Sequence, residues 1–335
     1  MRETLERLLD GTHLDEGEAS DLLLGLTERA VPQAMAGAVL AALRAKGETA
    51  DEVRGFSTAM RGLARRPALQ GGRRPVDVVG TGGDGSHSLN LSTGAALLAA
   101  ACGLPVAKHG NRSVSSRCGS ADVLEALGVP AQLDEQAAGS CFEQTGFTFL
   151  FAPYYHPAMA ALAPVRRALG VRTVFNLLGP LTNPASPPFG VLGAFSTRAA
   201  ELLAEALAGL PIERAFVVHG ACGWDEATPI GPFLLFDVRP GAVTRTVRDP
   251  ADIGLARCRP GDLAGADAAE NARRLEAVLD GERGPHRDAL VLGAALALEV
   301  AGEATPAEAA ARAGQALDEG AGKRLLSALR GFPRA

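Results

Sequence analysis

The spacing of apolar residues divides the chain into two parts near residue 70. In the first part they recur at the three-residue interval of one helix face, as at Leu5 and Leu8. Thr49 and Glu52 stand three residues apart before another such run, which is the pattern of a capping box that begins a helix. Residues 1–70 are therefore predicted to form a small domain made only of helices.

In the second part, short and nearly continuous apolar runs alternate with helical stretches. Such runs are typical of buried parallel strands, and their alternation with helices predicts an α/β domain. We expect this domain to span residues 71–335, with a mainly parallel central sheet flanked by helices and mostly helices beyond about residue 262. The runs predicted to be strands are residues 76–80, 104–110, 147–153, 189–195, 214–220 and 232–238.

Composition narrows the class of protein. Of 335 residues, 47% are hydrophobic and 21% are charged, as in ordinary globular proteins. Lys and Arg number 33 against 38 Asp and Glu, and only 4% of residues are aromatic, so we expect no nucleic-acid partner. The five cysteines form no C-x-x-C pair, the long apolar segments are interrupted, and the first residues lack a signal-peptide pattern. These features predict a cytoplasmic protein with no membrane partner.

The segment Gly80–Gly85 matches G-x-G-x-x-G, the pattern of a dinucleotide-binding loop, and it follows a predicted strand. However, the polar residues after it delay the next helix to about Asn90. The next strand ends in the cationic segment Lys108–Arg112, where a dinucleotide site would have an acidic residue for the ribose. The glycines are therefore better suited to presenting main-chain N–H groups to another phosphate.

Two further features favour an anionic ligand. The first alone is more often a helix cap, whereas a solvated basic loop would explain the charges of the second but not its serines and glycines. Ser92 and Thr93 stand at the start of a predicted helix, where free N–H groups attract anions. The second feature is the loop of residues 108–120, which holds Lys108, His109, Asn111, Arg112, Arg117 and four serines. The carboxyl ends of parallel strands share one edge of the sheet, so we expect one polyphosphate to lie across this loop and the glycine loop.

Asp225 and Glu226 follow another predicted strand. Adjacent carboxylates at a strand end are candidate ligands for Mg²⁺, which favours oxygen donors, although such a pair alone is usually a surface turn. Arg166, Arg167 and Arg172 lie in a segment broken by prolines. They are candidates for binding a carboxylate, and each is as readily a surface arginine.

Four motifs in the same order resemble the anthranilate phosphoribosyltransferase family, and the resemblance covers nearly the whole chain. This family transfers 5-phosphoribose from 5-phosphoribosyl 1-diphosphate (PRPP) to the amine of anthranilate and releases diphosphate, in the second step of tryptophan synthesis from chorismate. The resemblance implies dependence on Mg²⁺ and a homodimer. The motifs are Gly80–Asp84, Asn90–Thr93, Lys108–Gly128 and Arg172–Pro184.

The same resemblance implies a helical domain hinged to the α/β domain, with the active site between them. Helices from about 157–185 are expected to join residues 1–70 in space. A pyrimidine nucleoside phosphorylase would share this fold, but it would not need an acidic metal pair for a diphosphate. A relative that binds nucleic acid without catalysis should be basic over a broad face, and the net charge of −5 argues against it.

The resemblance implies ligand contacts residue by residue. Ser92, Asp225 and Glu226 match the metal ligands of the family. Ser88 stands where threonine is usual, which keeps the hydroxyl, and Trp224 stands where a smaller aliphatic residue is more common. The residues that match PRPP contacts are Gly80, Gly83, Asp84, Ser88, Asn90, Leu91, Ser92, Thr93, Lys108, His109, Gly110, Asn111, Arg112, Ser113, Val114, Ser115, Ser116 and Ser120.

For catalysis, the resemblance points to Lys108, Asn111 and Arg166. Arg166 matches the arginine that holds the anthranilate carboxylate, and Asn111 and Gly80 also lie close to anthranilate in the family. Lys108 is expected to stabilise charge on the leaving diphosphate. His109 is not expected to be a general base, because attack by an arylamine itself makes the amine proton acidic.

Overall fold

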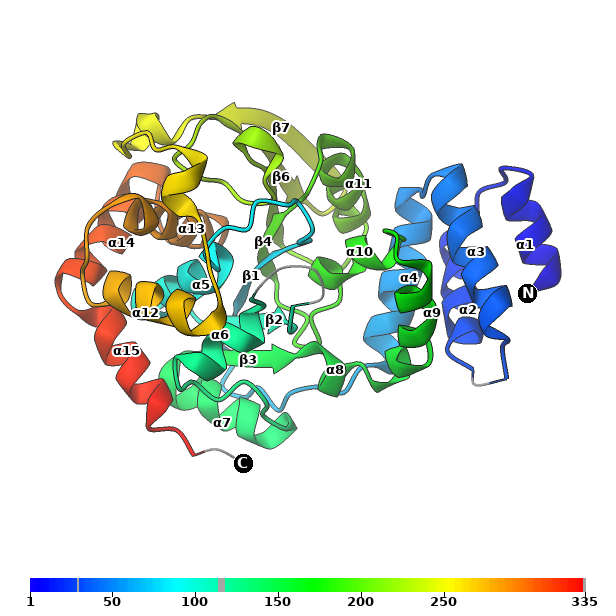
Figure 1. Ribbon diagram of the computed structural model, residues 1–335, viewed down its shortest axis with the longest axis horizontal. Helices are drawn as coiled ribbons and strands as arrows, with labels where there is room; N and C mark the ends of the chain where they lie inside the picture. Colours follow the sequence, from blue (N-terminus) through cyan, green and yellow to red (C-terminus); the bar gives the residue numbers. More distant parts are fainter. Residues whose placement is uncertain (29, 114–117, 334–335) are drawn as a thin grey trace.

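The computed structural model describes residues 1–28, 30–113 and 118–333. A group of helices forms one end of the molecule, and a sheet covered by helices forms the rest (Figure 1). The first part of the chain is helical, as its spacing predicted. Its helices are α1 (Arg2–Leu9), α2 (Glu16–Leu26), α3 (Gln33–Lys46) and α4 (Ala50–Leu63).

The strands of the described residues form one sheet in the order β3-β2-β1-β4-β5-β6-β7. Neighbours from β3 to β5 run parallel, whereas β6 and β7 are antiparallel additions at one edge. From β1 the chain moves outward through β2 and β3 and then returns to β4 on the other side of β1, so β1 and β4 flank the switch point where such sheets bind ligands. The strands are β1 (Val76–Gly80), β2 (Val106–Gly110), β3 (Phe147–Phe151), β4 (Phe189–Gly193), β5 (Arg214–His219), β6 (Phe233–Arg239) and β7 (Ala242–Arg248).

Helices cover both faces of the sheet, and the stretch after β7 is mostly helical, as predicted. None of the helices among the described residues is both long and apolar enough to cross a bilayer. The α-helices of the second part are α5 (Leu91–Ala101), α6 (Ser120–Ala126), α7 (Glu135–Thr145), α8 (Ala152–Tyr155), α9 (Ala163–Leu169), α10 (Phe175–Leu178), α11 (Thr197–Ala208), α12 (Ala268–Leu279), α13 (Pro285–Val300), α14 (Pro306–Asp318) and α15 (Ala321–Arg330).

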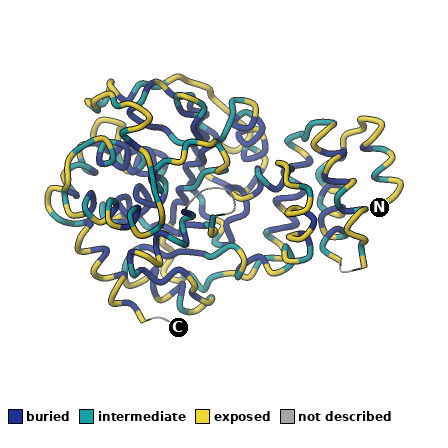
Figure 2. Tube along the Cα trace, in the orientation of Figure 1, coloured by how far each residue is buried: buried dark blue, intermediate teal, exposed yellow. Residues whose placement is uncertain are grey.

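Alternate side chains of the central strands enter two hydrophobic cores, one on each face. Phe216 and Val218 of β5 pack with α5 and α13, whereas Ala215 and Val217 pack with α4 and α11. Figure 2 accordingly shows the central strands in the colour of buried residues. A parallel sheet buried on both faces is what continuous apolar runs predict.

The helices at the end of the molecule are tied to the sheet by the second of these cores. Leu162 precedes α9 and Val165 belongs to it, and both are buried in the same core as α2, α3 and α4. The proposed domain limits, residues 1–70 joined by about 157–185, are compatible with this packing and stay a prediction.

Two local features of the fold were not predicted. Strand β7 was not predicted, because almost all of its residues are exposed and no buried apolar run marks it. At the start of α6, Gly119 occupies the N-cap position and Ser120 is the first helical residue. The Asp122 carboxylate accepts a hydrogen bond from the Gly119 N–H at 2.9 Å, which makes a serine cap unnecessary.

Candidate active site

The acidic segment that follows β5 lies directly on the ends of β1 and β4, at the switch point. A Cβ added to Gly80, the last residue of β1, would lie 2.4 Å from Asp225 Oδ2. One added to Gly193, the last residue of β4, would lie 1.5 Å from the Asp225 main-chain oxygen. Glycine at both strand ends therefore allows Asp225 to reach the edge of the sheet.

The glycine loop after β1 encloses Asp225. The Gly82 N–H donates to Asp225 Oδ2 at 2.5 Å, and the Asp225 N–H donates to Asp84 Oδ2 at 3.1 Å. Gly82 and Gly83 have φ angles of 68° and 73°, which residues with a side chain adopt only with strain. The loop therefore holds Asp225 in place through main-chain and side-chain hydrogen bonds.

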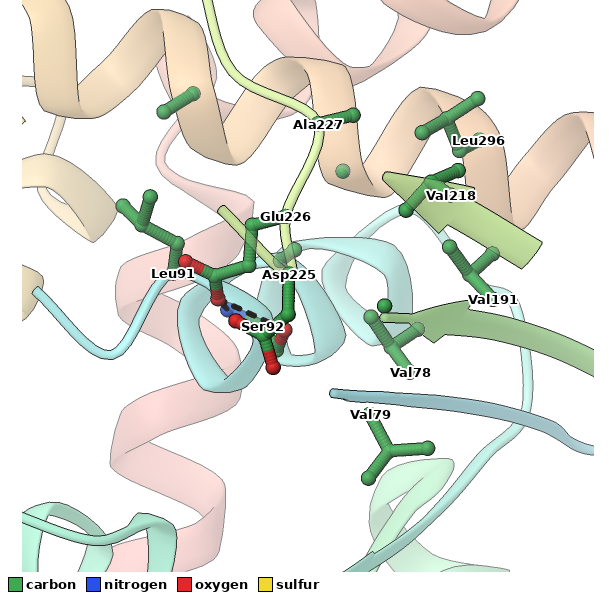
Figure 3. Close-up of a pocket in the computed structure, with 14 residues that line it drawn as sticks. Val78, Val79, Leu91, Ser92, Val191, Val218, Asp225, Glu226, Ala227 and Leu296 are labelled. Carbon is green, nitrogen blue, oxygen red and sulfur yellow. Dashed lines mark hydrogen bonds between the residues drawn. The ribbon is translucent and has the colours of Figure 1, made fainter. Parts of the chain in front are cut away.

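Glu226 connects the acidic segment to the start of α5. Its Oε1 accepts hydrogen bonds from the Ser92 N–H and hydroxyl, both at 2.9 Å, and its Oε2 accepts one from the Ser88 hydroxyl at 3.2 Å. Figure 3 shows Asp225 and Glu226 beside Ser92. Residues predicted from separate parts of the sequence therefore meet at one helix N-terminus, where the helix dipole favours negative charge.

The two carboxyl groups disfavour each other's charged form. Burial, followed by the charges of Glu226 and Asp84, raises the pKa of Asp225 well above its usual range. Burial also raises the pKa of Glu226 to about 7, although hydrogen bonds from Ser92 oppose this shift. A cation bound between the two carboxylates would relieve the repulsion.

The available donors suit a hard cation such as Mg²⁺, because the Asp225 and Glu226 carboxylates and the Ser92 hydroxyl all offer oxygen. Among the described residues, no group of three or more His, Cys, Asp and Glu side chains is arranged to hold a metal unaided. A cation here would therefore need further oxygens from a ligand or water. The cavity beside the pair is about 30 Å³, which admits only water-sized groups (Figure 3).

Lys108 and His109 lie at the end of β2, and both are buried. Lys108 Nζ donates to the Val78 carbonyl. Burial lowers the pKa of Lys108, against the negative charges of Asp77 and the acidic pair. His109 Nδ1 lies 3.2 Å from the Gly179 carbonyl, and burial lowers the pKa of His109 to about 3. His109 is therefore neutral near pH 7 and only weakly basic, and the expectation that it is not a general base stays a prediction.

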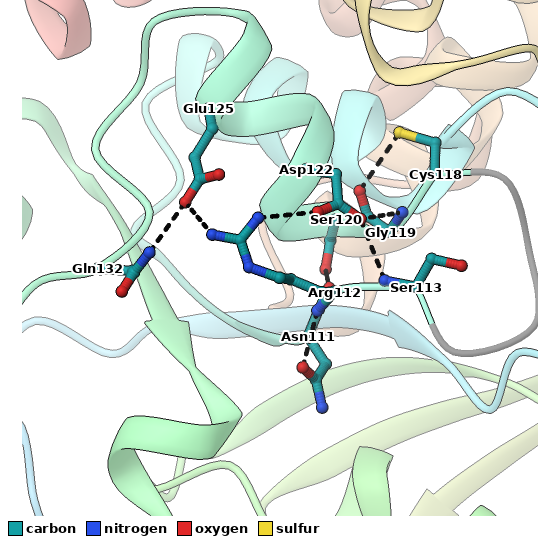
Figure 4. Close-up of polar contacts among 9 residues, drawn as sticks. All are labelled: Asn111, Arg112, Ser113, Cys118, Gly119, Ser120, Asp122, Glu125 and Gln132. Carbon is teal, nitrogen blue, oxygen red and sulfur yellow. Dashed lines mark hydrogen bonds and ion pairs between the residues drawn. The ribbon is translucent and has the colours of Figure 1, made fainter.

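The segment after β2 folds back on α6 (Figure 4). The Arg112 guanidinium donates to Asp122 at 2.9 Å and to Glu125 at 2.6 Å. The Ser120 hydroxyl donates to the Asn111 carbonyl at 3.1 Å. Arg112 was predicted to contact PRPP, but in this structure two carboxylates of α6 already bind its guanidinium.

Asn90 and its neighbours contribute in different ways. Asn90 Nδ2 donates to the Cys118 carbonyl at 3.0 Å, and Asn90 Oδ1 accepts from Asn271 of α12 at 3.0 Å. Leu91 and Thr93 are buried, and their N–H groups already donate to the carbonyls of Leu89 and Asn90, so neither N–H is free for a ligand in this structure. The predicted contacts Val114, Ser115 and Ser116 lie outside the described residues.

Arg166 lies apart from this cluster, on α9. Its side chain is exposed, its guanidinium carbon lies 4.9 Å from the centre of the Phe175 ring, and no described carboxylate pairs with it. Arg172 does touch the cluster, because its guanidinium donates to the Gly83 carbonyl and stacks on Phe195 at 4.1 Å. The segment with both arginines therefore reaches from the helical end to the glycine loop.

Three buried polar residues of the site were not predicted from the sequence, namely Asp77, Asn183 and Asn271. Asp77 interrupts the apolar run of a predicted buried strand, and this was a usable signal, because a carboxylate in such a strand needs a partner. Nothing comparable marks Asn271 in its helix.

Comparison with known proteins agrees with this arrangement. Residues 2–64 match the model of the glycosyl transferase family, helical bundle domain, and residues 72–323 match that of the glycosyl transferase family, a/b domain. The chain is 48% identical over 330 residues to the anthranilate phosphoribosyltransferase of Desulforudis audaxviator, covering 98% of this chain and 95% of that protein. It is 47% identical over 331 residues to the enzyme of Solibacter usitatus, covering 98% and 97%.

Solved structures show the same likeness. The crystal structure of anthranilate phosphoribosyltransferase from Thermus thermophilus superposes with a TM-score of 0.91 at 43% identity, covering 98% of each chain. The Saccharomyces cerevisiae enzyme in complex with PRPP and Mg has a TM-score of 0.89 at 27% identity, covering 98% of this chain and 96% of that one.

Proposed function

This chain belongs to the anthranilate phosphoribosyltransferase family of glycosyl transferases, and on that premise we propose which of its residues transfer 5-phosphoribose from PRPP to the amine of anthranilate. The observation that carries the assignment is the meeting of the glycine loop, the start of α5 and the acidic pair at one edge of the sheet. Hydrogen bonds from Gly82, Ser88 and Ser92 to Asp225 and Glu226 link these elements directly.

We assign the diphosphate of PRPP to this edge. Ser92, Asp225 and Glu226 would hold Mg²⁺, which when bound supplies positive charge to the leaving diphosphate. Support comes from the oxygen donors, from the raised pKa of both carboxyl groups and from the PRPP and Mg complex of the yeast relative. Lys108 adds a fixed positive charge at the end of the neighbouring strand.

We assign the carboxylate of anthranilate to Arg166, whose guanidinium has no acidic partner among the described residues. A guanidinium binds a carboxylate in two parallel hydrogen bonds, so Arg166 would both bind and orient the ring. Asn111 would lie between the substrates and align the amine with C1 of the ribose. Because attack makes the amine proton acidic, orientation contributes more than a base, and neutral His109 need not accept this proton.

The arrangement supports a hinged enzyme. Arg166 belongs to the helical end and the acidic pair to the sheet, so closure of one on the other would bring the substrates together. We propose this closure, with residues 65–75 as the connection, and we retain the homodimer and cytoplasmic location as predictions. Protease cleavage near residues 65–75 should change when both substrates are added.

The direct experiment follows the loss of anthranilate fluorescence in the presence of PRPP and Mg²⁺. The reaction should need all three components and should release diphosphate. Orthophosphate with a pyrimidine nucleoside should give no product. Turnover of orthophosphate with a pyrimidine nucleoside, with anthranilate left unchanged, would instead support a nucleoside phosphorylase.

A further inference from the structure

Strands β1 and β2 are joined differently from the other parallel neighbours in the sheet. β1 pairs with β4 over its whole length, from Val76 opposite Phe189 to Gly80 opposite Gly193. In contrast, β1 and β2 are paired only where Val76 lies opposite Val106. Beyond this point, main-chain hydrogen bonds do not hold together the two strands that end in the proposed PRPP loops.

Two buried side chains take the place of the missing ladder. Asp77 Oδ1 accepts a hydrogen bond from the His109 N–H at 3.2 Å, and Asp77 Oδ2 accepts one from Asn183 Nδ2 at 2.8 Å. The same Asn183 amide donates to the Ala107 carbonyl at 2.7 Å. Asp77 and Asn183 therefore bind the main chain on both sides of Lys108, and each of the two residues is only 2% exposed.

The Lys108 side chain returns to β1 across the same gap. Its Nζ donates to the carbonyl of Val78, the residue after Asp77. A complete pairing of the two strands would otherwise use this carbonyl. Three carboxylates lie close enough to affect the Lys108 charge, namely Asp77 from β1 and Asp225 and Glu226 from the acidic segment. Of these, Asp77 alone also binds the main chain of the strand that carries Lys108.

We propose that Asp77, held by Asn183, is a positioning residue for Lys108. Asp77 fixes the strand end from which Lys108 acts on the diphosphate of PRPP. The proposal rests on the role assigned above to Lys108. Burial raises the pKa of Asp77 to about 6, so its carboxylate is mostly charged near pH 7 and opposes the burial that lowers the pKa of Lys108. Asp77 thus supplies both geometry and charge.

The test is Asp77→Asn, which keeps the shape of the side chain, removes its charge and leaves one oxygen to accept where the carboxylate accepts from both His109 and Asn183. We expect kcat/KM for PRPP to fall about tenfold, with the KM for anthranilate changed less than about twofold. The neutral amide no longer supports the ammonium, so the pKa of Lys108 falls and the alkaline limb of kcat/KM for PRPP moves to lower pH. The acidic pair is the same in both proteins, so the difference between the profiles reports Asp77.

Thr148→Val is the matched control. Thr148 lies opposite Ala107 on the other side of β2, it is fully buried, and its hydroxyl has no hydrogen-bond partner among the described residues. This change should leave both KM values and the pH profile as in the wild type. A comparable shift in both variants would show a general response of the sheet and would overturn the proposal.

Lys108→Met separates this inference from the function on which it rests. If Lys108→Met keeps the wild-type kcat/KM for PRPP, the assignment of Lys108 itself is wrong. If Lys108→Met is impaired while Asp77→Asn keeps the wild-type alkaline limb and KM for PRPP, only the role of Asp77 is wrong. Should Asp77→Asn not fold, Asn183→Ala must weaken PRPP selectively, and equal loss for both substrates would overturn the proposal.

Discussion

The two ends of the proposed active site are prepared for their substrates in opposite ways. At the PRPP end, Asp225 is buried and accepts a hydrogen bond from Gly82, and Glu226 accepts one from Ser92. At the anthranilate end, Arg166 is exposed on a short helix and has no carboxylate partner among the described residues. One end holds two carboxyl groups whose repulsion a bound cation would relieve, whereas the other holds a positive charge that the substrate carboxylate would balance.

This difference teaches how far the effect of a substitution should spread. The acidic pair is bound to the glycine loop and to α5, so a change there disturbs several ligand contacts at once. Arg166 stacks on Phe175 and has no carboxylate partner among the described residues, so its loss should affect a single substrate. Graded substitutions at the two ends can therefore test the contrast.

The largest effect is expected from Asp225→Asn combined with Glu226→Gln. Without the two negative charges the site would lose its Mg²⁺, so turnover should fall by about a thousandfold or more. The melting temperature without Mg²⁺ should not fall, because the replacements remove two carboxyl groups whose charged forms are disfavoured by burial and by each other. Steady-state rates and calorimetry measure the two quantities.

Metal binding provides the control for this variant. Mg²⁺ with diphosphate should raise the melting temperature of the wild type, since a ligand that binds only the folded state stabilises it. The double variant should show no such rise. Wild-type turnover in the double variant would contradict the assignment of the metal site, whatever the melting temperature.

Arg166→Ala should have the next largest effect. Loss of a charge-assisted pair predicts an increase in the KM for anthranilate of about 10- to 100-fold, with the KM for PRPP nearly unchanged. Arg167→Ala is the matched control on the same helix, because Arg167 is also exposed. An equal increase in both KM values for Arg166→Ala would show that the two ends are not independent.

The helical first part, the mainly parallel sheet and the acidic pair could be predicted because each leaves a local signal. Apolar spacing marks the helices and strands, and Asp225 with Glu226 follows a strand that is easily recognised. The partners of Asp77 could not be predicted in the same way. Asn183 lies 106 positions further along the chain, and only the fold brings the two together.

Arg172→Gln should have a moderate effect, on the PRPP side only. The Arg172 guanidinium donates to the Gly83 carbonyl, and the Arg172 carbonyl accepts from Arg44 of α3. Loss of the first contact frees the glycine loop without touching the acidic pair, so the KM for PRPP should rise by about three- to tenfold. Kinetics with each substrate varied in turn will show whether the KM for anthranilate changes, which would place Arg172 at the other end.

Arg112→Ala should have the smallest effect, and it tests a residue that the sequence assigned to the PRPP end. Its side chain is 43% exposed, and its guanidinium is paired with Asp122 and Glu125 on the protein surface. Exposed pairs contribute at most about 1 kcal/mol, so urea unfolding should show a loss no larger than this. If Arg112 stays with these carboxylates during turnover, kcat/KM for PRPP should change by less than about threefold. A loss of a hundredfold would mean that PRPP draws Arg112 away from α6, so that part of the positive charge at this end is also supplied only when substrate binds.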